Sequence, residues 1–362
     1  MKLQRIFSTF TLVALLGFGL AAQSCKSSKP LTVSPSDSRI CYSGRINFNN
    51  PEKPLFVFPA TQIAVNFEGK GISMKAKPGS GHFMVSLDDK EAYKIVFTEN
   101  DSIIRLAENL SNGKHSLKVM LAIEGYEKRP EFHGFVIDGG KLLDKPAAPK
   151  KKVEVIGNSI TCGYGSEANS QKIHYSYDNS NHYYTYAAIL ARELDFEEMC
   201  VARSGIGVYR NYNGKFPGEN MTKWYDYTCI YDSTQVWDFN RFRPDVICVN
   251  LGTNDLSTKG YDIDTYKDSY RAFIKHLAEV QPQAKIAMLS SQMLTSKARK
   301  TQIETLKALY DELNGEGLNV YFFELDTQDP KLGYGADWHP SKAQHRQTAE
   351  QLKPFLKQLL ED

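Results

Sequence analysis

Four short segments of the sequence carry groups that together can transfer an acyl group. Ser159 follows Gly157-Asn158 and can act as the nucleophile, and His339 is the best candidate for the base because an imidazole titrates near neutral pH. Asn254 offers a side-chain amide, and Gly205 offers an unobstructed backbone N–H. With the backbone N–H of Ser159, these donors can form an oxyanion hole. The four segments therefore predict nucleophilic acyl transfer.

Each of these residues has a simpler explanation when it is taken alone. A serine after Gly-Asn is usually a turn or cap residue, a histidine before proline usually lies in a loop, and asparagine is a common turn former. Their joint occurrence points to a site, because three of the segments directly follow expected strands. In a parallel sheet the carboxyl ends of the strands share one edge. The segment around His339 joins that edge if its loop folds back.

The second half of the chain alternates strand and helix patterns. This alternation is typical of a parallel sheet with helices on both faces. Ser341, after Pro340, is expected to cap the last helix. The expected strands cover residues 153–156, 199–202, 245–251, 285–289 and 320–325, and the expected helices cover 183–194, 266–280, 301–313 and 341–360.

The first half of the chain contains only short strand patterns separated by turn residues. Many evenly spaced strands without a convincing helix predict a β-sandwich or jelly roll. Asp88-Asp89-Lys90 has the composition of a hairpin turn. The expected strands cover residues 43–48, 55–58, 62–67, 72–76, 82–87, 93–97, 102–106, 115–122 and 132–137.

These patterns divide the mature chain into two domains. We expect an all-β domain over residues 40–144 and an α/β domain over residues 153–362. Residues 145–152 contain two prolines and four lysines and are expected to form a solvated linker.

The first 25 residues have the pattern of a signal peptide. Lys2 and Arg5 precede an apolar run that is too short for a convincing membrane span. Small residues then lead to Cys25, as at a bacterial lipoprotein cleavage site, so lipidation of Cys25 is predicted, with residues 26–39 as a tether. Ordinary signal cleavage beside an incidental cysteine is the alternative. The predicted location is the periplasm or the outer membrane of a Gram-negative bacterium, with the membrane reached only through the lipid anchor.

Charge and cysteine content exclude several other classes of function. Lys2 and Arg5 account for the formal net charge of +2, so the body of the protein is neutral and lacks the basic surface of a nucleic-acid-binding protein.

Of the six cysteines, five remain beyond Cys25, so at least one is free or pairs with another chain. Cys248 fits a buried small hydrophobic residue. None has zinc-site spacing. No metal, cofactor or obligate protein partner is predicted.

The four segments resemble the conserved blocks of the SGNH hydrolases, also called GDSL-type esterases. Ser159, Gly205, Asn254 and His339 match the four residues that name that superfamily. The stretches at 157–165, 204–212, 252–255 and 337–341 are similar to carbohydrate esterase family two, whose members are acetylxylan esterases and related deacetylases. This resemblance implies an N-terminal jelly roll and a C-terminal three-layer, flavodoxin-like domain. It also implies a secreted serine esterase that removes O-acetyl groups from plant-type polysaccharides such as xylan and glucomannan.

The sequence departs from the superfamily pattern at two positions. The usual Gly-Asp-Ser is Gly-Asn-Ser here, so Asn158 supplies no carboxylate. The aspartate usually found three residues before the histidine is Ala336, and Asp337 is only two residues before it. Asp337 is a candidate third catalytic residue that orients His339. A backbone carbonyl is the alternative, which would leave a Ser-His dyad.

Aromatic residues near the blocks are candidates for sugar binding. The resemblance implies that Trp338 forms a sugar platform, and Tyr164 and Tyr209 are weaker candidates for the same groove. For Trp224 we favour core packing. His174 and His182 are expected on the surface, and Asp255 is expected to cap a turn.

Two other functions remain open at this stage. One is an inactive SGNH-fold lipoprotein that binds glycans, although a pure binder has no need of Ser159, Asn254 and His339 together. The other is an esterase for a lipid or sialate ester. A lipid substrate is not favoured, because the sequence has no long apolar stretch beside the site.

Overall fold

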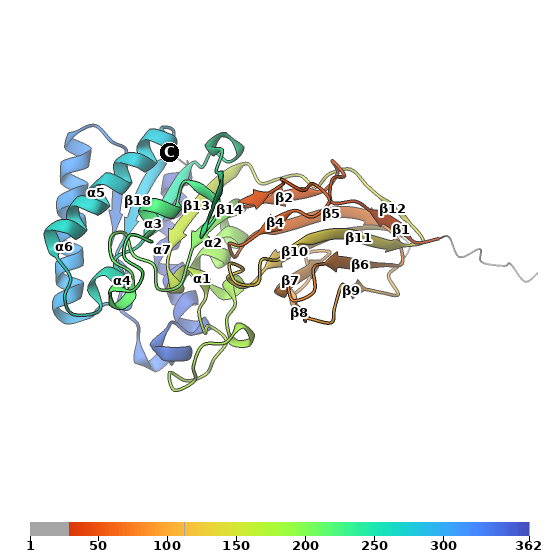
Figure 1. The fold of residues 1–362 in the computed structure, drawn as a ribbon, viewed down its shortest axis with the longest axis horizontal. Helices are drawn as coiled ribbons and strands as arrows, with labels where there is room; N and C mark the ends of the chain where they lie inside the picture. The colour runs from red at the N-terminus through yellow and green to blue at the C-terminus, as the bar shows by residue number, and fades with distance from the viewer. Residues whose placement is uncertain (1–28, 112, 362) are drawn as a thin grey trace, which may run out of the picture.

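The protein forms two domains, as Figure 1 shows for the computed structural model, which describes residues 29–111 and 113–361. A β-rich domain lies at one end of the long axis, and an α/β domain lies at the other. The predicted fold class is therefore confirmed. The predicted signal peptide and Cys25 lie outside the described residues. Among the helices of the described part, none combines the length and apolar character needed to span a membrane.

The first domain is a sandwich of two antiparallel sheets. In one sheet the strand order is β1-β11-β6-β9; in the other it is β12-β5-β10-β7-β8, with β2 also paired to β5. The strands are β1 (Leu31–Val33), β2 (Cys41–Ser43), β5 (Gln62–Glu68), β6 (Gly71–Ala76), β7 (Gly81–Leu87), β8 (Tyr93–Phe97), β9 (Ile103–Ala107), β10 (Lys114–Leu121), β11 (Phe132–Asp138) and β12 (Lys141–Leu142). A separate small pair consists of β3 (Ile46–Asn47) and β4 (Leu55–Phe56).

Alternation along the strands builds the core of this sandwich. In β10, Leu117, Val119 and Leu121 are buried while their neighbours are more exposed, as the period of two in a strand requires. Asp88 and Asp89 both have positive φ, at 54° and 53°, which is the backbone of a tight hairpin turn between β7 and β8. The predicted turn at this position is confirmed.

The second domain is built on a five-stranded parallel sheet of order β14-β13-β17-β18-β19. Its first strand begins at Lys151, so Lys151 and Lys152 belong to the sheet and not to the predicted linker. The strands are β13 (Lys151–Gly157), β14 (Phe196–Ala202), β17 (Val246–Asn250), β18 (Lys285–Leu289) and β19 (Val320–Phe323), and an antiparallel pair, β15 (Tyr227–Cys229) and β16 (Asp232–Val236), lies outside this sheet.

Helices cover both faces of the parallel sheet (Figure 1). Apolar side chains of α5 and α6 share one core with Ile247 and Val249 of β17, and those of α2 and α7 share another with Val246 and Cys248. The α-helices are α1 (Ser159–Cys162), α2 (Tyr186–Leu194), α3 (Met221–Trp224), α4 (Thr253–Leu256), α5 (Ile263–Val280), α6 (Ser296–Gly315) and α7 (Lys342–Glu361). The short 3-10 helices are η1 (Tyr177–Asn179), η2 (His182–Tyr184), η3 (Tyr212–Gly214), η4 (Phe239–Arg241), η5 (Pro330–Leu332) and η6 (Ala336–Trp338).

The strand order places a switch point at β13. From β13 the chain first adds β14 on one side and then adds β17 on the other side, so the two connections diverge there. In open α/β sheets the ligand site lies at the carboxyl end of such a strand. The segments that follow β14, β13 and β17 contain Gly205, Ser159 and Asn254, so three predicted site residues leave adjacent strands at one edge.

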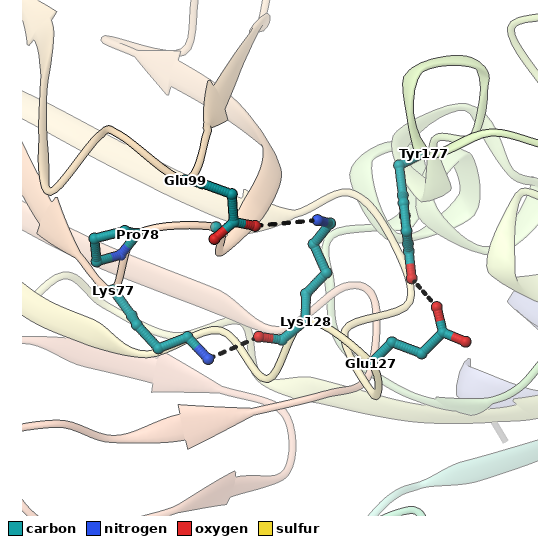
Figure 2. Close-up of a pocket in the computed structure, with 7 residues that line it drawn as sticks. Lys77, Pro78, Glu99, Glu127, Lys128 and Tyr177 are labelled. Carbon is teal, nitrogen blue, oxygen red and sulfur yellow. Dashed lines mark hydrogen bonds and ion pairs between the residues drawn. The ribbon is translucent and has the colours of Figure 1, made fainter.

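Residues 122–131, which connect β10 to β11 and which we term the junction loop, join the two domains. The carbonyl of Ala122 accepts a hydrogen bond of 2.7 Å from the backbone amide of His182. Figure 2 shows the hydroxyl of Tyr177 donating to Glu127, at 2.7 Å. A half-buried ion pair of 2.9 Å joins Arg129 to Asp232. The sandwich is therefore bonded to η1, η2 and β16 of the α/β domain.

Candidate active site

The nucleophile segment is fixed by tight local packing. Gly157 ends β13 where a Cβ would collide with the side chain of Thr161, so a larger residue does not fit. Asn158 is the N-cap of α1, and its side-chain oxygen accepts from the amide of Ile160 at 3.1 Å. Its side-chain amide donates to the carbonyl of Asn250 at 3.2 Å, which ties the end of β13 to the end of β17. Ser159 is thereby held as the first residue of α1.

Ser159 and His339 are in direct contact. The hydroxyl oxygen of Ser159 lies 2.8 Å from Nε2 of His339. On the other side of the ring, Nδ1 lies 3.1 Å from the carbonyl oxygen of Ala336 and 3.2 Å from that of Asp337. Because carbonyl oxygens only accept, Nδ1 carries the proton and Nε2 is the acceptor for the serine hydroxyl. This is the protonation state that a general base requires.

The loop that presents His339 has an unusual backbone. Asp337 and Trp338 both have positive φ, at 49° and 67°, in the left-handed region that residues other than glycine rarely adopt. The amide of Gly335 donates to the carbonyl of His339 at 2.8 Å and closes the turn. This turn brings the carbonyl groups of Ala336 and Asp337 onto the imidazole. Such strain persists only when surrounding contacts enforce it, and it is common at functional sites.

The environment of His339 favours the neutral imidazole. Burial lowers its pKa to about 4, although hydrogen bonds from the ring to the carbonyls of Ala336 and Asp337 act in the opposite direction. The ring of Tyr164 stacks on the imidazole with centroids 4.0 Å apart. The side chain is therefore ready to accept a proton at neutral pH.

This lowered pKa predicts activity that persists into mildly acidic solution. The base works when it is neutral, so kcat/KM falls only as the pH drops toward the pKa of His339. With a pKa of about 4, kcat/KM at pH 5.5 should stay within about twofold of its value at pH 7.5. A histidine at its ordinary pKa would lose about tenfold over the same interval. A pH profile of acetate release measures this, with circular dichroism at each pH as the control for folding. A midpoint near 6.5 would contradict the prediction.

The carboxylate of Asp337 does not orient His339. It accepts hydrogen bonds from the hydroxyl of Tyr164 at 2.8 Å, from Nδ1 of His174 at 2.7 Å and from the amide of Tyr175 at 3.0 Å. Partial burial raises its pKa, but these three donors outweigh burial and the pKa is lowered overall. The prediction of Asp337 as a catalytic carboxylate is therefore wrong for this geometry, and the alternative of a backbone carbonyl is the arrangement found. The reason is the turn at 336–338, which directs carbonyl groups toward the ring and the Asp337 carboxylate toward Tyr164.

Replacing Asp337 should therefore cost only part of the activity. Asp337→Ala removes the group that holds Tyr164 against His339 but leaves both backbone carbonyls, so we expect kcat/KM for p-nitrophenyl acetate to fall by at most about tenfold. Loss of a true orienting carboxylate costs about 10⁴-fold. Tyr164→Phe, which loses the same hydrogen bond from its other partner, is the matched control and should show a similar small loss. A decrease of thousands-fold in Asp337→Ala alone would contradict the dyad.

Three hydrogen-bond donors are available for an oxyanion. Ser159 is the first residue of a helix, and its amide has no carbonyl one turn earlier in the helix to bond. The amide of Gly205 donates to no protein acceptor in the described part of the chain, and its φ of 80° lies in the left-handed region. Asn254 gives one amide hydrogen to the carbonyl of Ile206, at 2.7 Å, which orients the other. The three donors come from the ends of three adjacent strands.

Asp255 joins the second and third segments. Its carboxylate accepts from the backbone amides of Val208, Tyr209 and Arg210 at 3.1, 2.9 and 3.0 Å. Burial raises its pKa to about 6, while these amide donors act in the opposite direction. Asp255 therefore holds a turn, as predicted, and the turn keeps Gly205 close to Asn254.

The aromatic candidates occupy different environments. Trp338 is 57% exposed beside His339, as an open platform requires. Tyr164 is packed between His339 and Tyr175, so it supports the catalytic histidine and offers no free face for sugar. The hydroxyl of Tyr209 accepts from the amide of Asp262 and anchors the start of α5. The sugar-binding predictions for Tyr164 and Tyr209 are not supported by these contacts.

Three further expectations are decided by burial. Trp224 is buried in the core, as favoured, and donates to Glu219 at 2.7 Å. His174 is exposed, as expected. His182 is not on the surface: it is fully buried between the carbonyl of Thr161, at 2.8 Å, and Glu198, at 2.9 Å. Its polar neighbours in the sequence gave no sign of this, because the contact is made with a distant residue, Glu198 of β14. The five described cysteines are free, and Cys248 is buried as predicted.

A hollow beside Gly205 contains residues that the sequence did not single out. Its volume is about 220 Å³. It is lined by Arg203, Gly205, Asn211, Tyr212, Lys215 and Phe216. Tyr212 and Phe216 are both more than half exposed. Tyr212 ends the stretch 204–212 quoted for the family resemblance, and this was the available signal. Exposed aromatic rings and polar groups beside an oxyanion donor suit the ring of a sugar.

A larger hollow of about 310 Å³ lies away from the serine, at the domain junction. Figure 2 shows its polar groups already bonded: Lys128 pairs with Glu99, Lys77 donates to the backbone carbonyl of Lys128, and Tyr177 donates to Glu127. The lining of this hollow contains none of the four residues Ser159, Gly205, Asn254 and His339.

Profiles of known protein families match both domains of the chain. The profile described as "Carbohydrate esterase 2 N-terminal" covers residues 42–146, and the profile described as "GDSL-like Lipase/Acylhydrolase family" covers residues 155–347. The second profile alone spans more than half of the chain.

Individual relatives agree with these profiles. The cellulase/esterase CelE of Acetivibrio thermocellus is 34% identical over 89% of this chain, which spans only 39% of that protein. An acetylxylan esterase / glucomannan deacetylase of Cellvibrio japonicus is 25% identical, with 91% of each chain covered. Among solved structures, a family two carbohydrate esterase from Clostridium thermocellum in complex with cellohexaose is 35% identical. Its TM-score is 0.84, with 89% of this chain and 99% of that chain covered.

Proposed function

The chain belongs to the family two carbohydrate esterases, and from this membership we propose that it removes O-acetyl groups from plant-type polysaccharides or their oligosaccharides. The observation that carries the proposal is the 2.8 Å contact between the Ser159 hydroxyl and Nε2 of His339. A glycan-binding protein without activity has no need of this pair. The xylan and glucomannan named for the relatives are the proposed substrate class.

The proposed reaction proceeds through an acyl-enzyme. Oγ of Ser159 attacks the acetyl carbonyl while its proton passes to Nε2 of His339. The amides of Ser159 and Gly205 and the side chain of Asn254 bind the oxyanion that forms. When the intermediate collapses, the C–O bond to the sugar breaks and His339 returns the proton to the sugar oxygen. Water, deprotonated by the same imidazole, then attacks the acyl carbon; the C–Oγ bond breaks, acetate leaves, and the imidazolium returns the proton to Oγ of Ser159.

The backbone carbonyls replace the acid of a triad in this scheme. Ala336 and Asp337 accept from Nδ1 and hold the tautomer, and their partial negative charges stabilise the imidazolium that forms at each step. The nearby Asp337 carboxylate adds a favourable charge without contacting the ring. The protein thus acts through a Ser-His dyad.

Surface features beside the dyad support a sugar substrate over a lipid. Trp338 is exposed next to His339, and the hollow at Gly205 combines Tyr212 and Phe216 with polar groups. A lipid ester would require a long apolar channel, and the hollow of about 220 Å³ is partly polar.

The substrate assignment is tested by acetate release from acetylated xylan, acetylated glucomannan and a series of p-nitrophenyl esters of increasing acyl length. Release from at least one polysaccharide, with p-nitrophenyl acetate turned over faster than the octanoate, is the expected result. Preference for the long ester, without release from either polysaccharide, would instead support a lipid esterase.

We also propose that the protein is exported and held in the periplasm or at the outer membrane by a lipid on Cys25. The support is the sequence pattern of residues 1–25 alone. Labelling of cells with a clickable fatty acid should modify the wild-type protein but not Cys25→Ala. Equal labelling of both would contradict the proposal. The enzyme is proposed to act without an obligate protein partner.

A further inference from the structure

The peptide unit between Ser204 and Gly205 is held at its carbonyl oxygen. A side-chain nitrogen of Arg203, Nη1, donates to the carbonyl of Ser204. In a trans peptide the C=O and the next N–H point in opposite directions, and no cis peptide occurs in the described residues. Fixing the carbonyl of Ser204 therefore fixes the direction of the Gly205 N–H, which is one of the three oxyanion donors.

The preceding peptide unit is held by a residue of the other domain. The amide of Ser204 donates to Oε1 of Glu124 at 2.6 Å, across 80 positions of the sequence. Glu124 is buried and belongs to the junction loop. Both peptide units that flank Ser204 thus end on a charged side chain, one from each domain.

Arg203 is itself fixed by aromatic rings from both domains. Its guanidinium lies 5.2 Å from the ring of Tyr126, on the junction loop, and 5.4 Å from the ring of Tyr231. These two rings contact each other edge to face with centroids 5.7 Å apart. Burial lowers the pKa of Arg203, but Tyr231, Tyr126 and Glu124 outweigh it and the pKa is raised overall. The guanidinium therefore stays charged.

The junction loop is rigid enough to carry Glu124. The amide of Gly125 donates to the carbonyl of Val57 at 2.8 Å, next to the glutamate. Further along the loop, Glu127 accepts from the hydroxyl of Tyr177, as Figure 2 shows, and Arg129 pairs with Asp232. Glu124 is bracketed by contacts to both domains.

We propose that Glu124 and Arg203 are positioning residues that orient the Gly205 N–H toward the oxyanion, so that the N-terminal sandwich takes part in catalysis. Gly205 needs external support because glycine has the freest backbone of all residues. Its left-handed φ of 80° is held by no side chain of its own. This inference rests on the proposed function, since it assigns a role within the same site.

The test compares three substitutions of Glu124 with a control on the same loop. Glu124→Met keeps the approximate volume but removes the acceptor, so kcat for p-nitrophenyl acetate should fall about tenfold to a hundredfold while KM stays within about twofold. Glu124→Gln keeps an acceptor oxygen and should stay within about threefold of wild type. Arg129→Ala breaks the ion pair with Asp232, another bond between the domains, without touching Ser204, and it should leave kcat within about twofold.

A boronic acid provides the readout that separates positioning from folding. Its adduct with Ser159 is tetrahedral and occupies the oxyanion hole, so the dissociation constant of phenylboronic acid should rise in Glu124→Met by about the factor lost in kcat. A merely structural role would instead lower the melting temperature and the fraction of serine titrated by a phosphonate, with kcat per titrated site unchanged. Wild-type kcat per site and wild-type boronate affinity in Glu124→Met would overturn the proposal.

Two further arms keep the outcome decisive. If Glu124→Met does not fold, Glu124→Asp takes its place, because aspartate withdraws the acceptor oxygen by one methylene. The aspartate variant should lose less kcat and less boronate affinity than expected for methionine, and the two losses should be parallel. Wild-type values of both quantities would overturn the proposal. A wild-type protein that binds the boronic acid but hydrolyses no acetyl ester would contradict the proposed function, and the boronate affinities of the variants would still decide the role of Glu124.

Discussion

The Ser159→Ala protein is expected to hydrolyse p-nitrophenyl acetate at least about 10⁴-fold more slowly than wild type. The hydroxyl 2.8 Å from Nε2 of His339 is the group that forms the acyl-enzyme, and alanine leaves the imidazole without a proton to accept. Alanine is compatible with the first turn of α1, so the fold should persist. Stopped-time assays of acetate release, which avoid the pH dependence of nitrophenol absorbance, measure the loss.

A covalent probe makes this prediction specific to the serine. A fluorophosphonate should modify wild type at Ser159, identified by peptide mass spectrometry, and should leave Ser159→Ala unlabelled. Ser166→Ala is the matched control: its hydroxyl lies on the following loop and donates to the carbonyl of Asn181, away from His339, so turnover and labelling should persist. Turnover by Ser159→Ala within about tenfold of wild type would remove Ser159 from the mechanism.

Asn254→Ala should give the next largest loss, about 10²-fold to 10³-fold in kcat, because it removes one oxyanion donor. Ground-state binding of the sugar does not use this donor, so KM should change little. The affinity for phenylboronic acid should weaken in proportion to kcat, as expected for a group that bonds the tetrahedral state and not the ester.

The second role of Asn254 requires a control. Its side-chain amide also donates to the carbonyl of Ile206, so Asn254→Ala could displace the segment that contains Gly205. Asn254→Asp keeps the shape but places a carboxylate against both the carbonyl and the oxyanion, and it should lose at least as much activity as alanine. Recovery of wild-type kcat in Asn254→Asp would show that only shape matters at this position and would exclude the donor role.

The dyad and the domain junction have a common feature: backbone groups perform tasks that side chains often perform. The carbonyls of Ala336 and Asp337 orient the base, and the amides of Ser159 and Gly205 are donors for the oxyanion. Backbone groups have no rotamers of their own, so their direction depends on turns and on neighbouring side chains. Asp337 and Glu124 are two such neighbours, and each acts through another residue.

Much of the molecule was determined by the sequence alone. Residue types limit the nucleophile and the base to few candidates, and the predicted pair Ser159 and His339 is the pair found in contact. The alternation of strand and helix patterns was enough to predict the parallel sheet, because the spacing of hydrophobic residues along an element follows directly from which of its faces are buried. The strand-end rule then placed Ser159, Gly205 and Asn254 at one edge, since it depends on topology and not on side-chain detail.

Other features were decided only by the tertiary structure. The group that orients His339 is a backbone carbonyl, and every residue has one, so residue type carries no information about it. The positive φ of Asp337 and Trp338, which turns those carbonyls to the ring, is imposed by surrounding contacts and not by residue preference. His182 is buried and Tyr164 is covered because distant segments pack on them. Glu124 contacts Ser204 across 80 positions of the sequence, and this contact exists only after both domains have folded. The local sequence pattern specifies which face of an element is buried, but it does not specify which partner covers that face.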